Sequence, residues 1–172
     1  MTTENENQLD LDSYLDFDID ELEIVEGFLV PAPGVYTFEG VELKQEKRTV
    51  KEAKDSDAEI DVTVAVAKFK IIGVVELAKA NTAQENIIGT ELNIMMQLEH
   101  VTDGFFFKQQ QSQMAMLTKP LAAAVGEKGF KGLVPHFPGM QFNGLIKNRK
   151  TADKVTKEIT VRWQLDAPVI PA

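Results

Sequence analysis

The sequence predicts a mainly β, antiparallel domain with one helix and a separate acidic N-terminal arm. In several segments apolar and polar residues alternate with a period of two, which is the pattern of half-buried strands. One segment has apolar residues at helical spacing, and acidic residues are concentrated near the N-terminus. At 172 residues the chain can form one domain with a sizeable core plus an arm. We therefore expect an acidic, flexible arm at residues 1–27 and a β domain at residues 28–172.

The charge of the chain is unevenly distributed. The net charge is −9, from 27 acidic and 18 basic residues. Residues 1–26 contain ten of the acidic residues and no Lys or Arg, which leaves 17 acidic against 18 basic residues, or about +1, for the rest. The low pI is therefore a property of the arm. It does not argue against nucleic-acid binding by the domain.

The first half of the domain predicts two strands joined by a charged connection. Residues 35–44 alternate, and the phase of their alternation changes at Gly40, as expected of a bulge or a sharp bend. Residues 45–59 lack an apolar rhythm and predict a loop or hairpin tip. Residues 60–77 predict a long strand whose apolar phase shifts between Val66 and Phe69. Such a shift is typical of a strand that bends, as strands do in small barrels.

The second half predicts a strand, a helix and a final hairpin. Residues 90–100 alternate most clearly, with apolar residues on one face from Leu92 onward. Apolar residues at helical spacing follow within 112–135. Ser112 is a candidate N-cap, and Pro120 indicates either a kink or a helix that starts near Thr118. Two last strands, at 140–147 and 157–166, flank a basic turn at 148–156.

The predicted order of elements is β-β-β-α-β-β. This is the order of the oligonucleotide-binding (OB) barrel, which has five strands and a helix between strands 3 and 4. The two phase shifts favour a closed barrel over an open sheet. A β-sandwich and another type of β-barrel are the alternatives.

Patterns typical of enzymes, cofactor sites and membrane spans are missing from the sequence. It has no cysteine, which excludes a thiolate metal site and a Cys nucleophile. Its two histidines, His100 and His136, are too far apart for a metalloprotease motif, and no phosphate-binding Gly-rich loop is present. The longest apolar runs are too short to cross a bilayer. We expect no catalytic activity, metal, cofactor or membrane contact, and a cytoplasmic location.

Two surfaces of the domain have the composition of a single-strand binding site, which combines aromatic faces with cations. One is the Phe105-Phe106-Phe107-Lys108 run. On an extended chain the three rings alternate in direction, so that at least one faces out. The other is the final hairpin, which has six basic residues and two acidic ones between 147 and 162. The expected nucleic-acid contacts are Lys68, Lys70, Phe105, Phe106, Phe107, Lys108, Lys147, Arg149, Lys150 and Arg162. For each surface a purely structural role is the alternative.

The arm has more regularly placed apolar residues than a solubility tail needs. We expect it to dock on a partner, with Leu15, Phe17, Asp18, Asp20 and Leu22 as contacts. A charged leader without a partner is the alternative.

From Phe28 to Asp166 the chain resembles small phage-encoded proteins from replication gene clusters that are regarded as OB-fold single-stranded DNA-binding proteins. The resemblance rests on the acidic leader with its Leu-Asp steps at 9–12, the Pro-x-Pro-Gly-x-Tyr segment at 31–36, the Lys68-Phe69-Lys70 strand and the helix around Lys119-Pro120-Leu121. In better-known single-strand binders the acidic arm is C-terminal, whereas it is N-terminal here.

The resemblance implies single-stranded DNA binding in phage replication or recombination, in the cytoplasm of the infected host. The arm would then recruit phage or host replication proteins, or compete with DNA for the binding groove. A homo-oligomer is also possible in such a protein. The alternative function is a protein-interaction or virion-structural β-barrel that binds no nucleic acid.

Overall fold

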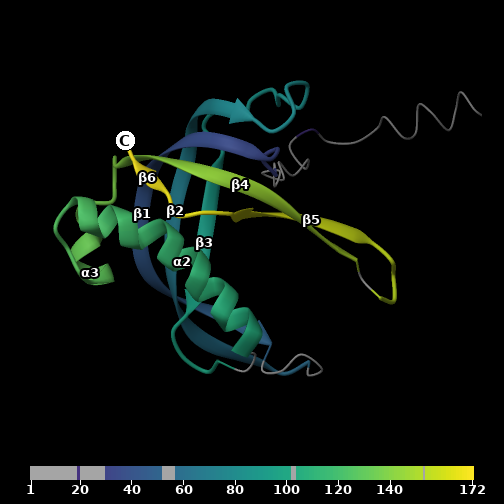
Figure 1. The fold of residues 1–172 in the computed structure, drawn as a ribbon. Coiled ribbons are helices and arrows are strands. Elements are labelled where there is room, and N and C mark those ends of the chain that lie inside the picture. The colour runs from purple at the N-terminus through teal and green to yellow at the C-terminus, as the bar shows by residue number, and fades with distance from the viewer. Residues whose placement is uncertain (1–18, 20–29, 52–56, 102–103, 153) are drawn as a thin grey trace, which may run out of the picture.

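The computed structural model describes residues 19, 30–51, 57–101, 104–152 and 154–172, without the side chains of Lys51 and Phe106. The elements are β1 (Gly34–Lys51), β2 (Glu59–Leu77), β3 (Glu91–Gln97), α2 (Gly104–Ala124), α3 (Phe130–Leu133), β4 (Gln141–Ala152), β5 (Ile159–Leu165) and β6 (Ile170–Pro171). The strands form one antiparallel sheet in the order β3-β2-β1-β4-β5, and β6 also pairs with β4. Figure 1 shows strongly curved β1 and β2 strands, with α2 lying across the sheet.

The mainly β, antiparallel class is confirmed, but the sheet is not closed into the predicted barrel. β3 and β5 are its two edges, and in the part of the chain that the structure describes no pairing joins them. The helix α2 contacts both edge strands instead. The sixth strand, β6, was not predicted because it is only two residues long.

Two glutamines one turn apart on α2 hydrogen-bond to the two sheet edges. Gln110 Oε1 accepts a hydrogen bond from the Gln97 N–H of β3, at 2.9 Å. Gln113 Oε1 accepts from the Leu165 N–H of β5 at 2.7 Å, and its Nε2 donates to the Leu165 carbonyl at 2.8 Å. A side-chain amide offers the same donor and acceptor as a peptide group. Gln113 therefore takes the place of one residue of a neighbouring strand.

The proline inside α2 attaches the C-terminal segment to the helix. Pro120 has no N–H, so the Met116 carbonyl four residues earlier has no partner within the helix. That carbonyl accepts a hydrogen bond from the Val169 N–H, at 3.1 Å. Val169 is buried in the core as a result. The proline thus lies within the helix rather than at its start.

The core lies between the sheet and α2, and its centre is aromatic. Phe38 packs edge-on against Phe69, with ring centroids 5.2 Å apart, and tilted against Phe142, at 5.5 Å. Gly40 lets the chain before β4 approach β1, because a Cβ at Gly40 would lie 2.2 Å from the Phe137 carbonyl oxygen. The bulge predicted at Gly40 is confirmed by a register shift between Gly40 and Glu42.

Strands β1 and β4 are both longer than predicted. Residues 45–51, expected in a loop, continue β1, because they pair with the apolar half of β2 around Val62, Val64 and Val66. These valines form a second small apolar cluster on the face opposite Phe69. The phase shift in β2 therefore reflects two halves that bury opposite faces. The register shifts within 34–42 provide the bending.

Candidate nucleic-acid interface

A two-stranded ribbon projects from the sheet. β4 pairs with β1 only from Gln141 to Ile146, so that from Lys147 onward it pairs with β5 alone. We call residues 147–152 and 159–164 the β4–β5 ribbon. Five of these positions, 148–152, were expected in the basic turn, and three of them pair with the β-branched residues Val161, Thr160 and Ile159 of β5. In Figure 1 the ribbon extends to the right past α2 and β3.

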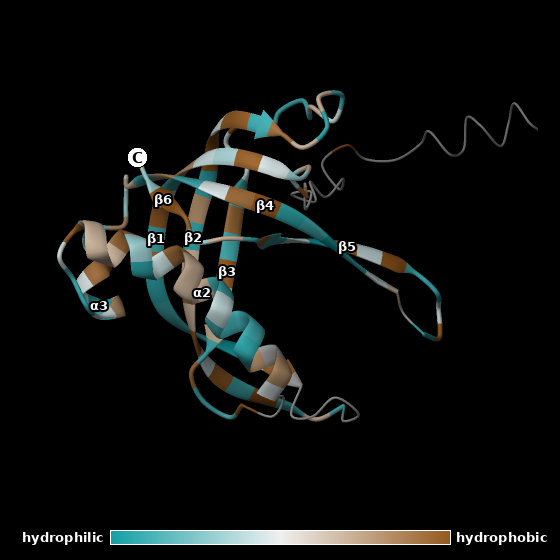
Figure 2. Cartoon of the chain, viewed as in Figure 1, coloured by the Kyte–Doolittle hydropathy of each residue, from teal (hydrophilic) through white to brown (hydrophobic). Residues whose placement is uncertain are grey.

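The ribbon has one apolar and one basic face, because residues paired across an antiparallel ladder share a face. On the side of the core, Trp163, Val161 and Ile159 follow the buried Leu165, and their exposure increases outward to 66% at Ile159. Trp163 is half-buried and packs edge-on against Phe69, at 5.9 Å. Hydrophobic and hydrophilic residues alternate along the ribbon in Figure 2.

On the opposite face two arginines stand directly across from each other. Arg149 of β4 pairs in register with Arg162 of β5, and both are exposed. Like charges in this position repel each other and destabilise the pair of strands. Among the described residues no carboxylate lies within ion-pair distance of either guanidinium. An anion placed over the pair would relieve the repulsion.

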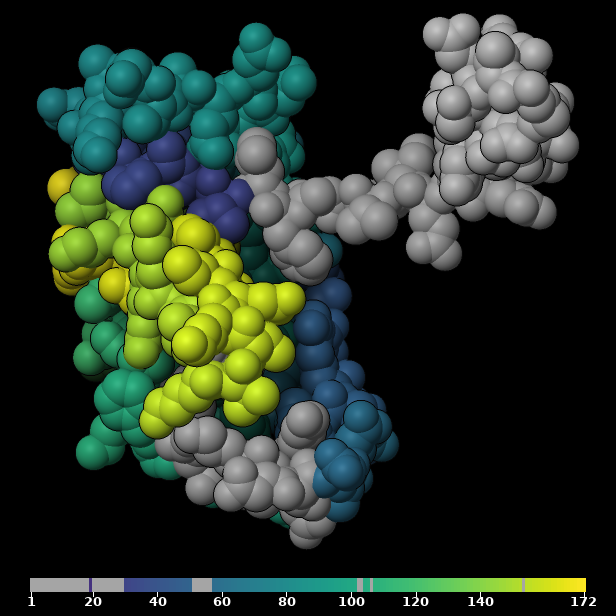
Figure 3. All heavy atoms as spheres, turned by 90° about the vertical axis from the view of Figure 1, so that its right-hand side faces the viewer, coloured from purple at the N-terminus to yellow at the C-terminus, as the bar shows by residue number. Residues whose placement is uncertain are grey.

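More cations surround this arginine pair. Lys147 lies one pair inward on the same face, and its Nζ is 3.8 Å from Asp166 Oδ1. Lys150 lies on the other face, opposite Val161. Lys154 and Lys157 are exposed at the hairpin tip. The ribbon faces the viewer in Figure 3, where its yellow-green and yellow atoms stand in front of the domain. All six cations of the hairpin are exposed, so a large ligand can reach them.

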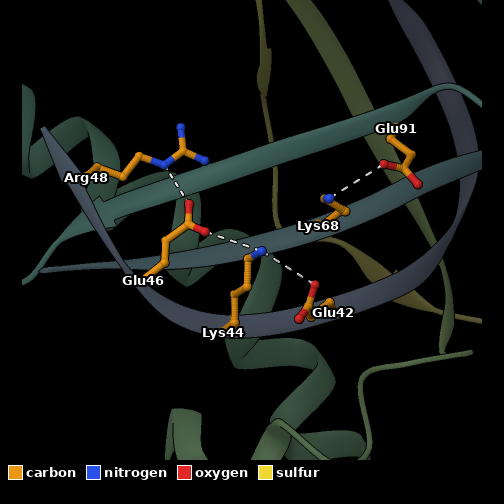
Figure 4. Close-up of polar contacts among 6 residues, drawn as sticks. All are labelled: Glu42, Lys44, Glu46, Arg48, Lys68 and Glu91. Carbon is orange, nitrogen blue, oxygen red and sulfur yellow. Dashed lines mark hydrogen bonds and ion pairs between the residues drawn. The ribbon is translucent and has the colours of Figure 1, made fainter.

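Lys68 and Lys70 have a different environment from the ribbon cations. Both lie on the face of β2 opposite Phe69, but each has a carboxylate neighbour. Lys68 Nζ lies 3.8 Å from Glu91 and Lys70 Nζ lies 3.5 Å from Glu39. On the same face Lys44 lies between Glu42 and Glu46, and Arg48 pairs with Glu46, as Figure 4 shows. Positive and negative charges therefore nearly balance on this face. The arginines of the ribbon have no such carboxylate partners among the described residues.

The three phenylalanines lie in the first turn of α2. The expectation of an extended chain there is wrong, because the helix begins at Gly104, eight residues before Ser112. Phe105 is 62% exposed, Phe107 is half-buried and Lys108 is exposed. The side chain of Phe106 lies outside the described residues. The N-terminal end of α2 is its lower right end in Figure 1, on the side from which the ribbon projects.

The expected partner contacts of the arm, Leu15, Phe17, Asp18, Asp20 and Leu22, lie outside the described residues. Within the described ranges no group of three or more His, Asp or Glu side chains could hold a metal ion. No described helix is long and apolar enough to cross a membrane. The glutamines of α2 were not predicted as contacts of the sheet edges, since a Gln-rich run has no periodic signal.

Comparisons with known proteins leave the family of this chain undefined. No protein-family model matches the sequence, and neither a curated protein nor a solved structure is significantly similar to it. Any assignment of function therefore depends on the geometry of the chain itself.

Proposed function

We propose that this protein is a binding protein rather than an enzyme, and that its ligand is single-stranded DNA. The observation that carries the proposal is the Arg149–Arg162 pair, in which two exposed guanidinium groups face each other across the ribbon. Two like charges held side by side on paired strands favour a polyanion, because each phosphate removes part of their repulsion. Lys147 and the lysines of the tip would extend the path for a phosphate backbone, and Lys150 adds a cation on the opposite face of the ribbon.

The strand order supports the same proposal. We interpret the sheet as an OB-type fold opened between its third and fifth strands, with α2 filling the gap. OB folds bind oligonucleotides over the face of strands 2 and 3 and through the loops between strands 1 and 2 and between strands 4 and 5. The loop between strands 4 and 5 corresponds here to the tip of the β4–β5 ribbon.

Base stacking would come from exposed aromatic rings. Phe105 is the best candidate among the described rings, since most of its surface is exposed. Stacking on one aromatic side chain contributes about 1–3 kcal/mol per base and tolerates any sequence. Lys68 and Lys70 have a smaller role in this proposal than the ribbon. Exposed ion pairs are weak enough for a phosphate to replace the carboxylates, but the phosphate has to compete with them.

The setting we propose is a phage-infected cell, with the protein acting in DNA replication or recombination. The acidic arm would recruit replication proteins or compete with DNA for the ribbon. Deleting residues 1–26 tests the competition, because removing ten negative charges should tighten DNA binding if the arm occupies the cationic path. An unchanged affinity would remove competition from the proposal and leave recruitment.

Titration of a fluorescent dT oligomer with the full chain at several salt concentrations tests DNA binding. We expect binding at low salt that weakens linearly as the logarithm of the salt concentration rises. Absence of binding at low salt, or affinity that does not depend on salt, would refute the proposal.

A second candidate is a protein-interaction or virion-structural domain. It is favoured by the exposed apolar side chains of Ile159 and Val161 on the ribbon. This function predicts a stable complex with a phage or host protein that survives nuclease treatment, together with no affinity for oligonucleotides. Affinity capture from infected lysate, with and without nuclease, separates the two functions.

A further inference from the structure

The outer edge of β5 has free hydrogen-bonding groups. Leu165 directs its N–H and carbonyl away from β4, toward Gln113. The next residue, Asp166, directs its N–H toward the Leu145 carbonyl of β4. Because backbone groups alternate in direction along a strand, the N–H and carbonyl groups of Trp163, Val161 and Ile159 also point away from β4. Within the described part of the chain no other strand pairs with this edge.

This edge has few of the features by which proteins protect exposed strands, and Arg162 is the single charged residue of β5. It has no proline, and its outward-pointing residues are β-branched or aromatic, which favours pairing with another strand. The same residues have their side chains on the apolar face of the ribbon. A strand added here would therefore satisfy backbone groups and cover apolar surface together.

We infer that β5 pairs with β5 of a second copy of this chain, antiparallel and about a two-fold axis at Val161. In this register Val161 lies opposite its own copy, and Ile159 lies opposite Trp163 of the other copy. Each of these pairs would exchange two backbone hydrogen bonds. Thr160 then faces Arg162 of the other copy, so that the arginines of the two copies are not placed opposite each other.

The segment complements itself, which is why a second copy fits better than an unrelated strand. When the segment 159–163 of the second copy is placed antiparallel to that of the first, with Val161 opposite Val161, apolar residues lie opposite apolar residues. Such pairs of aromatic and β-branched side chains stabilise antiparallel sheets. Gln113 ends the free edge at Leu165, so the paired region is limited to 159–163. The strand of the second copy would therefore pair with β5 only as far as Trp163, because the Gln113 side chain already occupies the backbone groups of Leu165.

The dimer would have one continuous sheet across both ribbons. A two-fold axis perpendicular to that sheet places the Arg149 and Arg162 side chains of both copies on the same side. The inference does not depend on DNA binding, and its tests are made without nucleic acid. In the dimer, the cationic surface would be shared by two chains.

Sedimentation of the full chain, compared with the variant Val161→Pro, tests the pairing. The Val161 N–H points away from β4, so proline at this position keeps the ribbon and removes the central hydrogen bonds of the dimer. We expect twice the 19.1 kDa chain mass for the unmodified protein and a single chain mass for Val161→Pro. Val161→Thr, which keeps the N–H, should remain dimeric. A monomeric unmodified chain, or a Val161→Pro variant that dimerises equally well, would overturn the inference.

Disulfide trapping tests the register of the two strands, and it does not depend on whether the proline variant folds. The chain has no cysteine, so Val161→Cys introduces a single thiol. Hydrogen-bonded partners lie about 5.5 Å apart between Cα atoms, which is within disulfide range. The two copies of an Ile159→Cys variant would lie about 14 Å apart along the strand and should not cross-link. Equal cross-linking of both variants, or of neither, would contradict the register.

Discussion

Replacing Arg149 and Arg162 by alanine should reduce the salt dependence of DNA binding by a calculable amount. Five cations of the hairpin have no carboxylate neighbour among the described residues: Arg149, Lys150, Lys154, Lys157 and Arg162. Each phosphate contact to a single strand contributes about −0.7 to the slope of log K against log salt. Five contacts give a slope of about −3.5, and the double variant should have a slope of about −2.1.

These slopes translate into measurable losses of affinity. From 50 to 200 mM salt, the unmodified chain should lose affinity roughly 100-fold and the double variant roughly 20-fold. The assay is fluorescence anisotropy of a labelled dT oligomer at four or more salt concentrations. Circular dichroism spectra should stay unchanged, because both side chains are exposed and removing them relieves repulsion across the ribbon.

A variant with the same loss of charge supplies the control. Lys68→Ala combined with Lys70→Ala also removes two positive charges, but from lysines that already have carboxylate neighbours at 3.8 and 3.5 Å. Its slope should stay close to that of the unmodified chain. If the lysine variant lowers the slope as much as the arginine variant does, the DNA path does not follow the ribbon and the reasoning is wrong.

Three further predictions concern stability. Gln113→Ala should lower the free energy of unfolding by about 1–3 kcal/mol in urea titrations, because the part-buried backbone groups of Leu165 lose their partner. Gly40→Ala should lower the thermal midpoint strongly, because the added Cβ would lie 2.2 Å from the Phe137 carbonyl oxygen and force the chain apart. Glu99→Gln should weaken the loss of stability in acid. Hydrogen bonds from a threonine hydroxyl and N–H lower the pKa of Glu99, so its contribution is present above about pH 4.5 and is lost as the pH falls through the lowered pKa.

Each of these changes has a neighbouring control. Gln111→Ala alters an exposed glutamine of the same helix and should have little effect on unfolding. Gly129→Ala adds a Cβ with no atom within 4 Å, so its thermal midpoint should be close to that of the unmodified chain. Thr63→Val removes the hydroxyl donor to Glu99 and should weaken the acid dependence in part. Equal effects of the Gln113 or Gly40 variant and its control would contradict the proposed cause, and so would an acid dependence that Thr63→Val leaves unchanged.

The sequence predicted the parts of the fold that depend on residues close together in the chain. The alternation that starts at Leu92 identified β3, and Leu92 and Ile94 are buried as expected. The bulge at Gly40 followed from a change of phase. Arg162 was predicted as a nucleic-acid contact of the final hairpin, and it lies on the basic face, with the buried Leu165 on the other face. In each case, burial of one side of a strand produces an alternation of apolar and polar residues in the sequence.

The sequence did not predict features that depend on contacts between distant segments. Residues 45–51 have no apolar rhythm, and they form a strand because β2 supplies the hydrogen bonds. The phenylalanines of α2 suggested an extended chain, although packing of the helix against β3 extends it back to Gly104. The ion pairs of Lys68 and Lys70 join strands that are distant in sequence. The pattern of residues within one strand could not predict these partners, because they lie on other strands.

The projection of the ribbon connects the two proposals. A two-stranded ribbon in water is marginally stable by itself, and this one also holds Arg149 against Arg162. Phosphates would stabilise it through its basic face, and a second copy would stabilise it through its free edge. The two sites do not overlap, because the arginine side chains leave the strand perpendicular to the direction of the backbone groups. Dimerisation should therefore strengthen DNA binding, and Val161→Pro should weaken it even though the cations of each chain are unchanged.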